Sequence, residues 1–327
     1  MSVRWGLLST ARINRLVLAG ARASANAEVV AVASRGAARS EEYAREHGIE
    51  RAHGSYEALL DDPDVDAIYV PLPNALHVEW TLRALEAGKH VLCEKPFSRR
   101  AHEVEEAFDL AKREGLVLSE GFMFRHHPQT HAISRLVGEG AIGRLRVIRA
   151  QFGFDLAGVH GPEDARFDPA LDGGSLMDVG CYCVNAIRLL GGEPERVHAE
   201  QMVGPSGVDV CFTAGLRLPG DVLAHFDCGF VLPFRDELEV VGEDGSLFVD
   251  DPWHVHAPGV ELRRDGETEA IRIAPTDSYA LELENVSDAI LGHGELLLGR
   301  ADAVGQAAAI EALYHAAETR QPVEVPS

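Results

Sequence analysis

The sequence predicts an α/β fold, a doubly wound parallel sheet, followed by an α+β part with an open, largely antiparallel sheet. Three observations support this prediction. Over the first 120 residues, short apolar runs alternate with segments of helical period, as in consecutive β-α-β units. After about residue 122, alternating strand-like runs are separated by turn pairs such as Asp265-Gly266. At 327 residues and 46% hydrophobic composition, the chain can bury a sizeable core, and its length suggests two domains or one domain with an elaborate extension.

The first part has the pattern of a Rossmann fold, in which ligands bind at the carboxyl ends of parallel strands. The expected strands are residues 3–8, 28–34, 66–72, 90–96 and 116–122. The expected helices are residues 11–22, 38–48, 76–88 and 101–115. Several of these helices end at a glycine, namely Gly48, Gly88 and Gly115, as a left-handed C-cap requires.

The second part is predicted to be rich in strands. The expected strands are residues 144–154, 197–203, 208–218, 222–232, 237–243, 246–251, 260–265 and 269–275. The expected helices are residues 127–140 and 177–192, with 278–294 and 302–320 closing the chain. We place the boundary between the two domains between residues 121 and 122, and leave open whether the closing helices pack back on the first domain.

Composition narrows the class of protein. A formal net charge of −22 argues against nucleic acid or an anionic membrane surface as the main partner, because both require clustered Lys and Arg. Five cysteines form an odd set in a chain too long to need disulfide bridges, which indicates a reducing compartment. No run of about 18 apolar residues occurs, and Arg12, Asn14 and Arg15 interrupt the stretch that imitates a signal peptide. We therefore expect a cytoplasmic protein with no membrane span.

The first strand leads into the turn GLLSTARIN, where a dinucleotide-binding fold carries three glycines. The three glycine positions hold Ser9, Ala11 and Asn14, so the motif is altered. Small residues still let backbone N–H groups approach a pyrophosphate at the helix N-terminus. The alternative, a turn that binds no cofactor, stays open. The candidates for cofactor contact here are Ser9, Thr10, Ala11, Arg12 and Ile13.

The second strand ends with residues that favour NADP over NAD. An NAD site usually carries an acidic residue here, which accepts from the ribose 2′-OH. This chain has Ser34 and Arg35, followed one turn later by Arg39. A hydroxyl and guanidinium groups suit a 2′-phosphate, because Arg binds phosphate through charge-assisted paired hydrogen bonds. The alternative is a pair of solvated arginines at a helix start.

The strand at 66–72 runs into a helix start at the same rim of the predicted sheet. Four residues here are candidates for cofactor contact: Pro71, Leu72, Asn74 and His77. For Asn74 we favour a role as cap of the following helix. For His77, a structural position and a place beside the nicotinamide ribose stay equally open.

The strand at 90–96 delivers Glu94 and Lys95 to this rim, and Pro96 ends it because proline lacks a backbone donor. Lys95 is one of three lysines in a chain that otherwise uses arginine. A compact ammonium group in a crevice can stabilise a developing alkoxide or lower the pKa of a neighbouring group. Glu94 is either a partner of Lys95 or a contact to the cofactor ribose.

The segments GKHVLCEKP and DGGSLMDVGCYCVNAIRLLGG, with a Pro-Asn-x-x-His helix start before the first, resemble the Gfo/Idh/MocA family of NAD(P)-dependent oxidoreductases. The resemblance extends over essentially the whole chain. It implies that Asp178 and Tyr182 face Lys95 across the nicotinamide. Asn185 stands where many members have Asp, and Tyr182 where most have His. The sequence is more similar to the branch with Tyr, which includes dimeric dihydrodiol dehydrogenases and NADP-dependent D-xylose dehydrogenases.

The spacing of these residues is consistent with that chemistry. On a helix, Asp178 and Tyr182 share a face at i and i+4. A tyrosine with a pKa of about 10 becomes a base at neutral pH only if a nearby cation lowers that pKa, and Lys95 is the candidate. A half-buried core aromatic is the structural alternative for Tyr182. The glycines expected to leave room for ligand and cofactor are Gly173, Gly174 and Gly180.

Other polar residues are weaker candidates. The resemblance implies a place for Arg125 near the cofactor, and a salt bridge at the domain interface is an equal alternative. Arg166, with its neighbours His160 and Asp168, is a candidate for binding substrate hydroxyls, although a solvated loop is favoured for this stretch.

The sequence thus predicts an oxidoreductase that transfers a hydride between NADP and a carbinol carbon of a sugar or related polyol, of the aldose 1-dehydrogenase type. Lys95, Asp178 and Tyr182 are the expected catalytic residues, and with Arg166 they are expected to contact the substrate. Residues 1–121 would form the NADP-binding domain, and residues 122–327 the substrate and oligomerisation domain.

Two other functions stay open: a trans-dihydrodiol dehydrogenase, and a non-catalytic NADP-binding sensor of the same fold. The resemblance implies a homodimer or homotetramer. We expect no metal site, because His254 and His256 alternate on one strand face without a third ligand at a sensible spacing.

Overall fold

A computed structural model of the protein describes residues 1–325. Contacts divide these residues into two compact units. Unit one comprises 1–98, 102–123 and 277–304, and unit two comprises 99–101, 124–276 and the described residues from 305 onward. The boundary expected between residues 121 and 122 lies close to the passage between the units at 123 and 124. The functions predicted for the two domains stay predictions.

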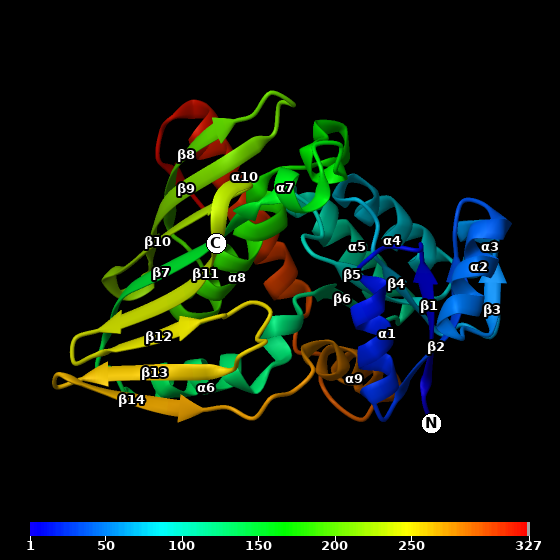
Figure 1. Cartoon of the computed structure of the whole chain (residues 1–327), viewed down its shortest axis with the longest axis horizontal. Helices are drawn as coiled ribbons and strands as arrows, with labels where there is room; N and C mark the ends of the chain where they lie inside the picture. The colour runs from blue at the N-terminus through cyan, green and yellow to red at the C-terminus, as the bar shows by residue number, and fades with distance from the viewer. Residues whose placement is uncertain (326–327) are drawn as a thin grey trace. The chain divides into compact units, whose positions relative to one another are not determined.

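Unit one contains a parallel sheet, which within residues 1–325 has six strands in the order β3-β2-β1-β4-β5-β6 (Figure 1). Its strands are β1 (Val3–Leu8), β2 (Ala27–Ala33), β3 (Arg51–His53), β4 (Ala67–Val70), β5 (His90–Glu94) and β6 (Leu118–Gly121). This is the strand order of a Rossmann fold and confirms the predicted doubly wound sheet. The short strand β3 was not predicted, since three residues give no readable alternation.

The helices of unit one follow the predicted segments closely. They are α1 (Asn14–Ala23), α2 (Ala37–His47), α3 (Tyr56–Leu60), α4 (His77–Glu86), α5 (Ala101–Glu114) and α9 (Ser278–Leu291), with the 3-10 turn η1 (Asn74–Leu76). A second 3-10 turn, η2 (Met123–His126), begins in unit one and continues into unit two. The short α3 was not predicted. Gly48, Gly88 and Gly115 adopt φ values of 72°, 76° and 69° after α2, α4 and α5, which confirms the predicted left-handed ends.

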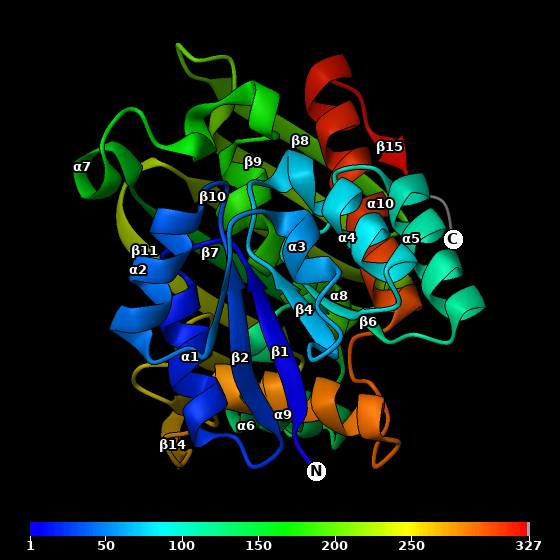
Figure 2. The same cartoon turned by 90° about the vertical axis from the view of Figure 1, so that its right-hand side faces the viewer.

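A helix from the end of the chain packs into unit one. Figure 2 shows α9 beside α1 and the strands β1 and β2. The two helices approach closely at Gly20, because a Cβ there would lie 2.7 Å from the backbone nitrogen of Ala280. Trp5 on β1 donates from Nε1 to Ser287 Oγ on α9 at 3.2 Å. The apolar core of unit one therefore includes a helix from beyond residue 276.

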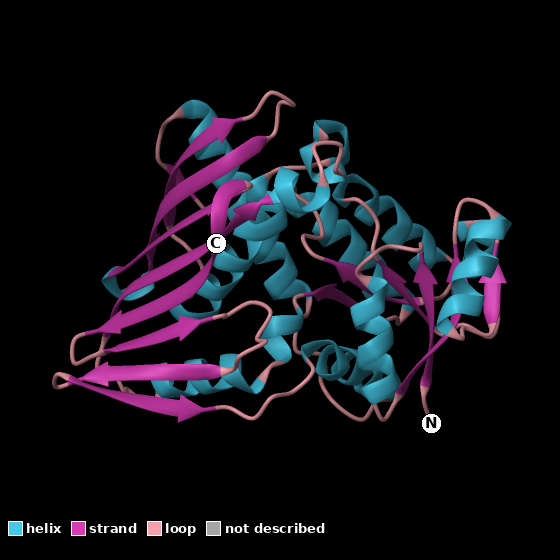
Figure 3. Cartoon of the chain, in the orientation of Figure 1, coloured by secondary structure: helices cyan, strands magenta, loops and turns pink. Residues whose placement is uncertain are grey.

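Unit two contains a second, largely antiparallel sheet (Figure 3). Within residues 1–325 its nine strands follow the order β14-β13-β12-β11-β7-β10-β9-β8-β15. The strands are β7 (Leu145–Asp155), β8 (Arg196–Val203), β9 (Asp209–Leu218), β10 (Val222–Gly229), β11 (Val231–Gly242), β12 (Ser246–Asp250), β13 (Gly259–Arg264), β14 (Glu267–Arg272) and β15 (Val323–Glu324). The central pair β7 and β10 is parallel. The predicted strand 222–232 corresponds to β10, which ends earlier, at Gly229, and β11 begins at Val231, well before the predicted strand 237–243.

The helices of unit two lie on one face of this sheet. They are α6 (Pro128–Gly138), α7 (Leu156–His160), α8 (Cys181–Gly191) and α10 (Arg300–Thr319), with short turns η3 (Ala165–Phe167), η4 (Pro169–Leu171) and η6 (Pro219–Asp221) and the π-helical turn η5 (Leu176–Gly180). Alternate strand residues such as Phe212 and Phe226 are buried beneath the helices, whereas Thr213 and His225 are exposed on the other face. No helix within residues 1–325 is both long and apolar enough to cross a bilayer.

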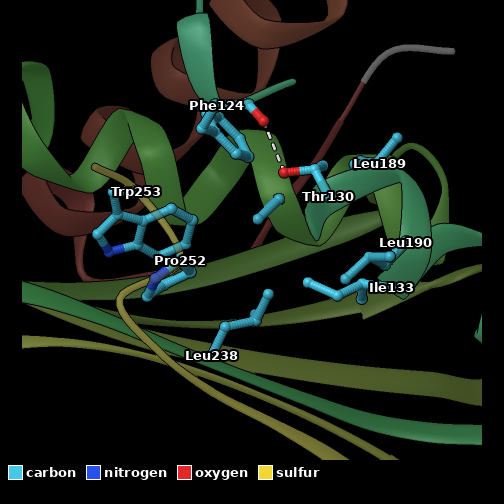
Figure 4. A pocket seen from close by; sticks show the side chains of 9 residues that line it. Phe124, Thr130, Ile133, Leu189, Leu190, Leu238, Pro252 and Trp253 are labelled. Atoms are coloured by element: carbon cyan, nitrogen blue, oxygen red, sulfur yellow. Dashed lines mark hydrogen bonds between the residues drawn. The ribbon is translucent and has the colours of Figure 1, made fainter. Parts of the chain in front are cut away.

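A small apolar cavity lies between α6, α8 and β11 (Figure 4). Its volume of about 10 Å³ has room for roughly one water molecule. Phe124, Ile133, Leu238 and Trp253 contribute to its wall, and Thr130 Oγ1 donates to Phe124 O at 2.6 Å. The cavity is a packing gap in the core and is too small for a substrate.

We predict that Lys89→Met destabilises the fold. The Lys89 ammonium group is buried and donates to Asp62 O and Val65 O, both at 2.7 Å. Methionine leaves both carbonyls without this donor, so the free energy of unfolding should fall by about 2 kcal/mol. Chemical denaturation measures the change. Lys112→Met, at an exposed position of α5, is the matched control, and equal stability of the two variants would contradict the prediction.

Candidate active site

The turn between β1 and α1 is closed by its own side chains. Asn14, at the third glycine position of the fingerprint, donates from Nδ2 to Ser9 O at 2.7 Å. Ala11 N–H donates to Ser9 Oγ at 3.2 Å. Ser9 has a φ of 153°, a backbone conformation that glycine adopts more readily than serine. The turn therefore keeps a backbone conformation at position 9 that suits glycine, although the residue there is serine.

The turn after β2 lies against this first turn. Arg39 Nε donates to Thr10 Oγ1 at 2.7 Å. Ser34 Oγ donates to Gly36 O at 2.7 Å, and a Cβ placed at Gly36 would meet no atom within 4 Å. Arg35 and Arg39 are both exposed. The structure thus brings the predicted residues of the two turns together, with two guanidinium groups directed to solvent at the carboxyl end of β2.

The donors in these turns fit an NADP cofactor. Burial raises the pKa of Tyr56, and the positive charges of Arg35 and Arg39 oppose that rise, so both arginines lie near this ring. Two guanidinium groups and the Thr10 hydroxyl form a set of donors suited to a phosphate monoester. Within residues 1–325, no acidic side chain ends β2 where an NAD ribose would need one.

The helix start after β4 differs from the expectation for Asn74. Asn74 opens the 3-10 turn η1, and the N-cap of α4 is Leu76, without a side-chain hydrogen bond. Asn74 therefore does not occupy the N-cap position of α4, because the 3-10 turn separates it from that helix. Pro71 O accepts from Ser9 Oγ at 3.5 Å, which links this segment to the first turn.

His77 links two backbone segments of the rim. Its ring is buried, with Nδ1 2.9 Å from Pro96 O and Nε2 2.7 Å from Leu72 O. Burial lowers the pKa of this imidazole. With both ring nitrogens directed at main-chain carbonyls, the geometry favours the structural alternative for His77, a connection between the loop after β4 and the segment after β5.

The segment around Lys95 is fixed from several sides. The Lys95–Pro96 peptide bond is cis. Glu94 accepts from the Tyr69 hydroxyl and, through Oε2, from the Lys95 backbone N–H at 3.2 Å. Phe97 N–H donates to Glu120 Oε1 at 2.8 Å. Burial, and then the charge of Glu94, raise the pKa of Tyr69 well above its ordinary value, so the phenol stays a donor.

In unit two, the double glycine packs against the protein itself. A Cβ at Gly173 would lie 2.4 Å from Arg166 O, and one at Gly174 would lie 2.2 Å from Asp209 Oδ1. A Cβ at Gly180 would lie 2.7 Å from Cys228 Sγ. The room attributed to these glycines is therefore filled by the chain's own backbone and side chains, and it does not mark space for a ligand.

Asp178 sits in the π-helical turn η5 and not in a regular α-helix. Its Oδ2 accepts from Arg166 Nη1 at 3.0 Å, and Arg166 Nε donates to Asp164 Oδ1 at 2.9 Å. Burial alone would lower the pKa of the Arg166 guanidinium group, because it disfavours the charged form. The negative charges and hydrogen bonds of Asp178 and Asp164 outweigh this effect, so the pKa is raised above its usual value. Arg166 thus joins two carboxylates, and one of them is the predicted site residue Asp178.

Tyr182, near the start of α8, is surrounded by rings. The centroids of Phe152, Phe124, Trp253 and His254 lie 5.6, 5.8, 6.0 and 6.4 Å from that of Tyr182. Phe124, Phe152 and Trp253 are buried, and His254 is partly exposed. Tertiary packing therefore fixes the plane of the Tyr182 ring.

Arg125 and Asn185 form a buried pair in unit two. Arg125 Nη1 donates to Asn185 Oδ1 at 2.9 Å, and Asn185 Nδ2 lies 3.3 Å from Gln306 Oε1. Gln306 also donates to Cys181 O at 2.8 Å. An amide at position 185 fits this network, because it accepts from Arg125 and also offers a donor to Gln306.

Several residues that shape the site were not found by sequence reasoning. Asp209 accepts from Ser175 Oγ and Leu176 N–H at 2.7 Å and from Tyr314 Oη at 2.9 Å. Asp164, two residues before Arg166, was not singled out either. Trp253 reaches Tyr182 from a distant segment, just as Ser175 and Tyr314 reach Asp209. No spacing rule links positions more than 30 residues apart, so these partners gave no local signal.

Two family models match the chain. Residues 3–122 match the model of an oxidoreductase family with an NAD-binding Rossmann fold, GFO_IDH_MocA, and residues 130–248 match the GFO/IDH/MocA C-terminal domain. The gap between the two matches, between residues 122 and 130, includes the point at 123 and 124 where the chain passes from unit one to unit two.

Known proteins resemble the chain over nearly its full length. It is 38% identical to D-xylose 1-dehydrogenase (NADP(+)) 2 of Haloferax volcanii, over 98% of this chain and 99% of that protein. It is 37% identical to trans-1,2-dihydrobenzene-1,2-diol dehydrogenase of Bos taurus, over 87% and 84%. A crystal structure of a 3-ketoreductase from Actinomadura kijaniata with NADP and TDP-benzene superposes with a TM-score of 0.90, at 32% identity over 97% and 98% of the two chains. The chain therefore belongs to the Gfo/Idh/MocA family and is an NAD(P)-dependent oxidoreductase, as its sequence predicted.

Proposed function

We propose that the protein transfers a hydride between NADP and a carbinol carbon of a sugar or related polyol, in the manner of an aldose 1-dehydrogenase. The observation that carries the proposal is the setting of Tyr182. Its ring is held among four other rings, one turn after an aspartate, Asp178, that is fixed by Arg166. The xylose dehydrogenase from Haloferax volcanii supports the sugar class, because it resembles this chain from end to end.

The bound cofactor would supply a hydride acceptor at nicotinamide C4. Tyr182 takes the proton from the substrate hydroxyl as general base, or donates it when the reaction runs towards reduction. Lys95 binds the substrate oxygen and lowers the pKa of the tyrosine, since an ammonium group favours the phenolate. Asp178, oriented by Arg166, positions the substrate or the lysine. Glu94 and Tyr69 hold the backbone that carries Lys95.

We propose NADP as the preferred cofactor, bound through Thr10, Arg35 and Arg39. The Arg39–Thr10 hydrogen bond brings both turns to one place, and the exposed guanidinium groups suit a 2′-phosphate. The remaining predicted cofactor contacts in unit one follow the rim of the parallel sheet, and for His77 among them the geometry favours a structural role. Arg125, also predicted near the cofactor, lies in unit two and donates to Asn185.

A second candidate function is oxidation of trans-dihydrodiols. The rings around Tyr182 favour a flat, apolar substrate body, and the resemblance to the diol dehydrogenase of Bos taurus extends over 87% of the chain. A non-catalytic sensor is the weaker alternative. A sensor that only binds NADP would not need Asp178 and Tyr182 to be held in a fixed arrangement.

We further propose a homodimer or homotetramer in the cytoplasm. The face of the second sheet that carries Arg149, His225 and Thr213 is exposed to solvent, whereas the opposite face is buried under helices. A second subunit is a natural cover for such a face. An odd set of five cysteines, in a chain too long to need disulfide bridges, supports a reducing compartment.

Replacing Lys95 or Tyr182 tests the proposed mechanism. Lys95→Ala and Tyr182→Phe should each lower kcat by about 10²-fold or more, because each removes a group that acts in the transition state. NADP affinity, measured by calorimetry, should largely survive. NADPH formation is followed with a panel of aldoses and trans-diols, and Lys112→Ala is the control. An unchanged rate in either variant would disprove the assigned roles, and wild-type inactivity on the whole panel with tight NADP binding would favour the sensor.

Cofactor choice is tested by Arg39→Ala and by the double variant with Arg35→Ala. Loss of a charge-assisted hydrogen bond to phosphate should raise the KM for NADP about 10-fold or more and leave the KM for NAD nearly unchanged. Arg45→Ala, an exposed arginine of the same helix α2, is the matched control. Equal changes for both cofactors would show that these arginines do not read the 2′-phosphate.

A further inference from the structure

His254 is a polar group in an otherwise apolar wall around Tyr182. Its ring lies edge to face against Phe152, with centroids 5.6 Å apart, and 6.4 Å from the ring of Tyr182. Phe124 and Phe152 offer only carbon surfaces. The indole nitrogen of Trp253 donates to Gln151 O at 3.1 Å. Among these described rings, His254 is the one that combines partial exposure with both a donor and an acceptor.

The loop that carries His254 is firmly anchored. Asp251 accepts backbone hydrogen bonds from Val255 at 2.7 Å, from His256 and from Ala257 at 3.1 Å. Gln129 Nε2 donates to Asp251 O at 3.0 Å. These bonds fix the backbone on both sides of His254, which holds the imidazole in one place relative to Phe152.

The backbone within this loop carries strain. Val255 has a φ of 54°, an unusual value for a β-branched residue. Strained backbone of this kind persists where the surrounding structure holds it, and it often accompanies ligand-binding segments. The strained residue, Val255, directly follows His254. Its backbone N–H donates to the Asp251 carboxylate, and this hydrogen bond offsets the cost of the strain.

We propose that His254 binds a second hydroxyl group of the substrate, on the carbon next to the one that is oxidised. This inference rests on the proposed function, since it places the reacting hydroxyl at Tyr182. A small-molecule site is mostly apolar, with a few polar groups that fix orientation. An imidazole on the wall beside Tyr182 suits a vicinal diol unit, with one oxygen at the phenol and the next at the imidazole. His254 is therefore assigned as the residue that selects substrates with a hydroxyl group on the neighbouring carbon.

The test compares an active aldose with its analogue that lacks the neighbouring hydroxyl, the 2-deoxy sugar. The wild-type enzyme should prefer the complete substrate by about 10-fold in kcat/KM, the effect of one hydrogen bond. His254→Phe keeps a ring against Phe152 and should reduce this preference to near one, with little change in kcat/KM for the deoxy sugar. His254→Gln keeps a donor and an acceptor and should retain part of the preference. His293→Phe, at an exposed histidine in unit one, is the control.

The same ligand pair is titrated by calorimetry into the protein loaded with NADP. This readout separates the inference from the proposed function. If wild type binds the complete sugar more tightly in a His254-dependent way but does not turn it over, the inference stands and the proposed function fails. If turnover depends on Tyr182 but His254→Phe and His254→Gln both keep the wild-type preference, the proposed function stands and the inference is wrong. If neither binding nor turnover distinguishes the two sugars in wild type, the inference is also wrong.

Discussion

The buried carboxylate of Asp209 is the contact on which the geometry of unit two depends. It lies at the start of β9 and accepts from Ser175 and Leu176 at the beginning of the π-helical turn, and from Tyr314 on α10. Burial raises the pKa of this carboxyl and its donors lower it. Gly174 has no side chain because the carboxylate occupies that place. One side chain thus fixes a strand, a helix start and the C-terminal helix together.

The position of Tyr182 follows from this contact. The π-helical turn anchored by Asp209 carries Asp178 and runs directly into α8, where Tyr182 lies. An extra residue in a helical turn is common at functional sites, because it changes the direction in which side chains point. In unit one, His77 and Glu94 serve a comparable purpose, since both hold the backbone around Lys95. In both units, tertiary hydrogen bonds position the proposed catalytic groups.

Sequence pattern was sufficient for what depends on local spacing. Apolar runs and glycine ends located most strands and helices, and the EKP segment with the DGG segment identified the family. Short elements such as β3 and the π-helical turn were missed, because three to five residues carry no readable period. Asn74 opens a 3-10 turn and does not occupy the N-cap position of α4, and nothing local in the sequence shows that such a turn intervenes. Arg166, a partner of Asp178, is a residue that the sequence predicted for the site, but the ion pair between the two is visible only in the fold.

Hydride transfer from a carbinol carbon to the nicotinamide can be followed with an isotope. D-xylose that carries deuterium at C1 is incubated with the enzyme and NADP. We expect deuterium at C4 of the reduced nicotinamide, in one stereochemical position and in an amount equal to the sugar oxidised, as seen by NMR. Reduced cofactor without deuterium, or deuterium released to water, would contradict this transfer.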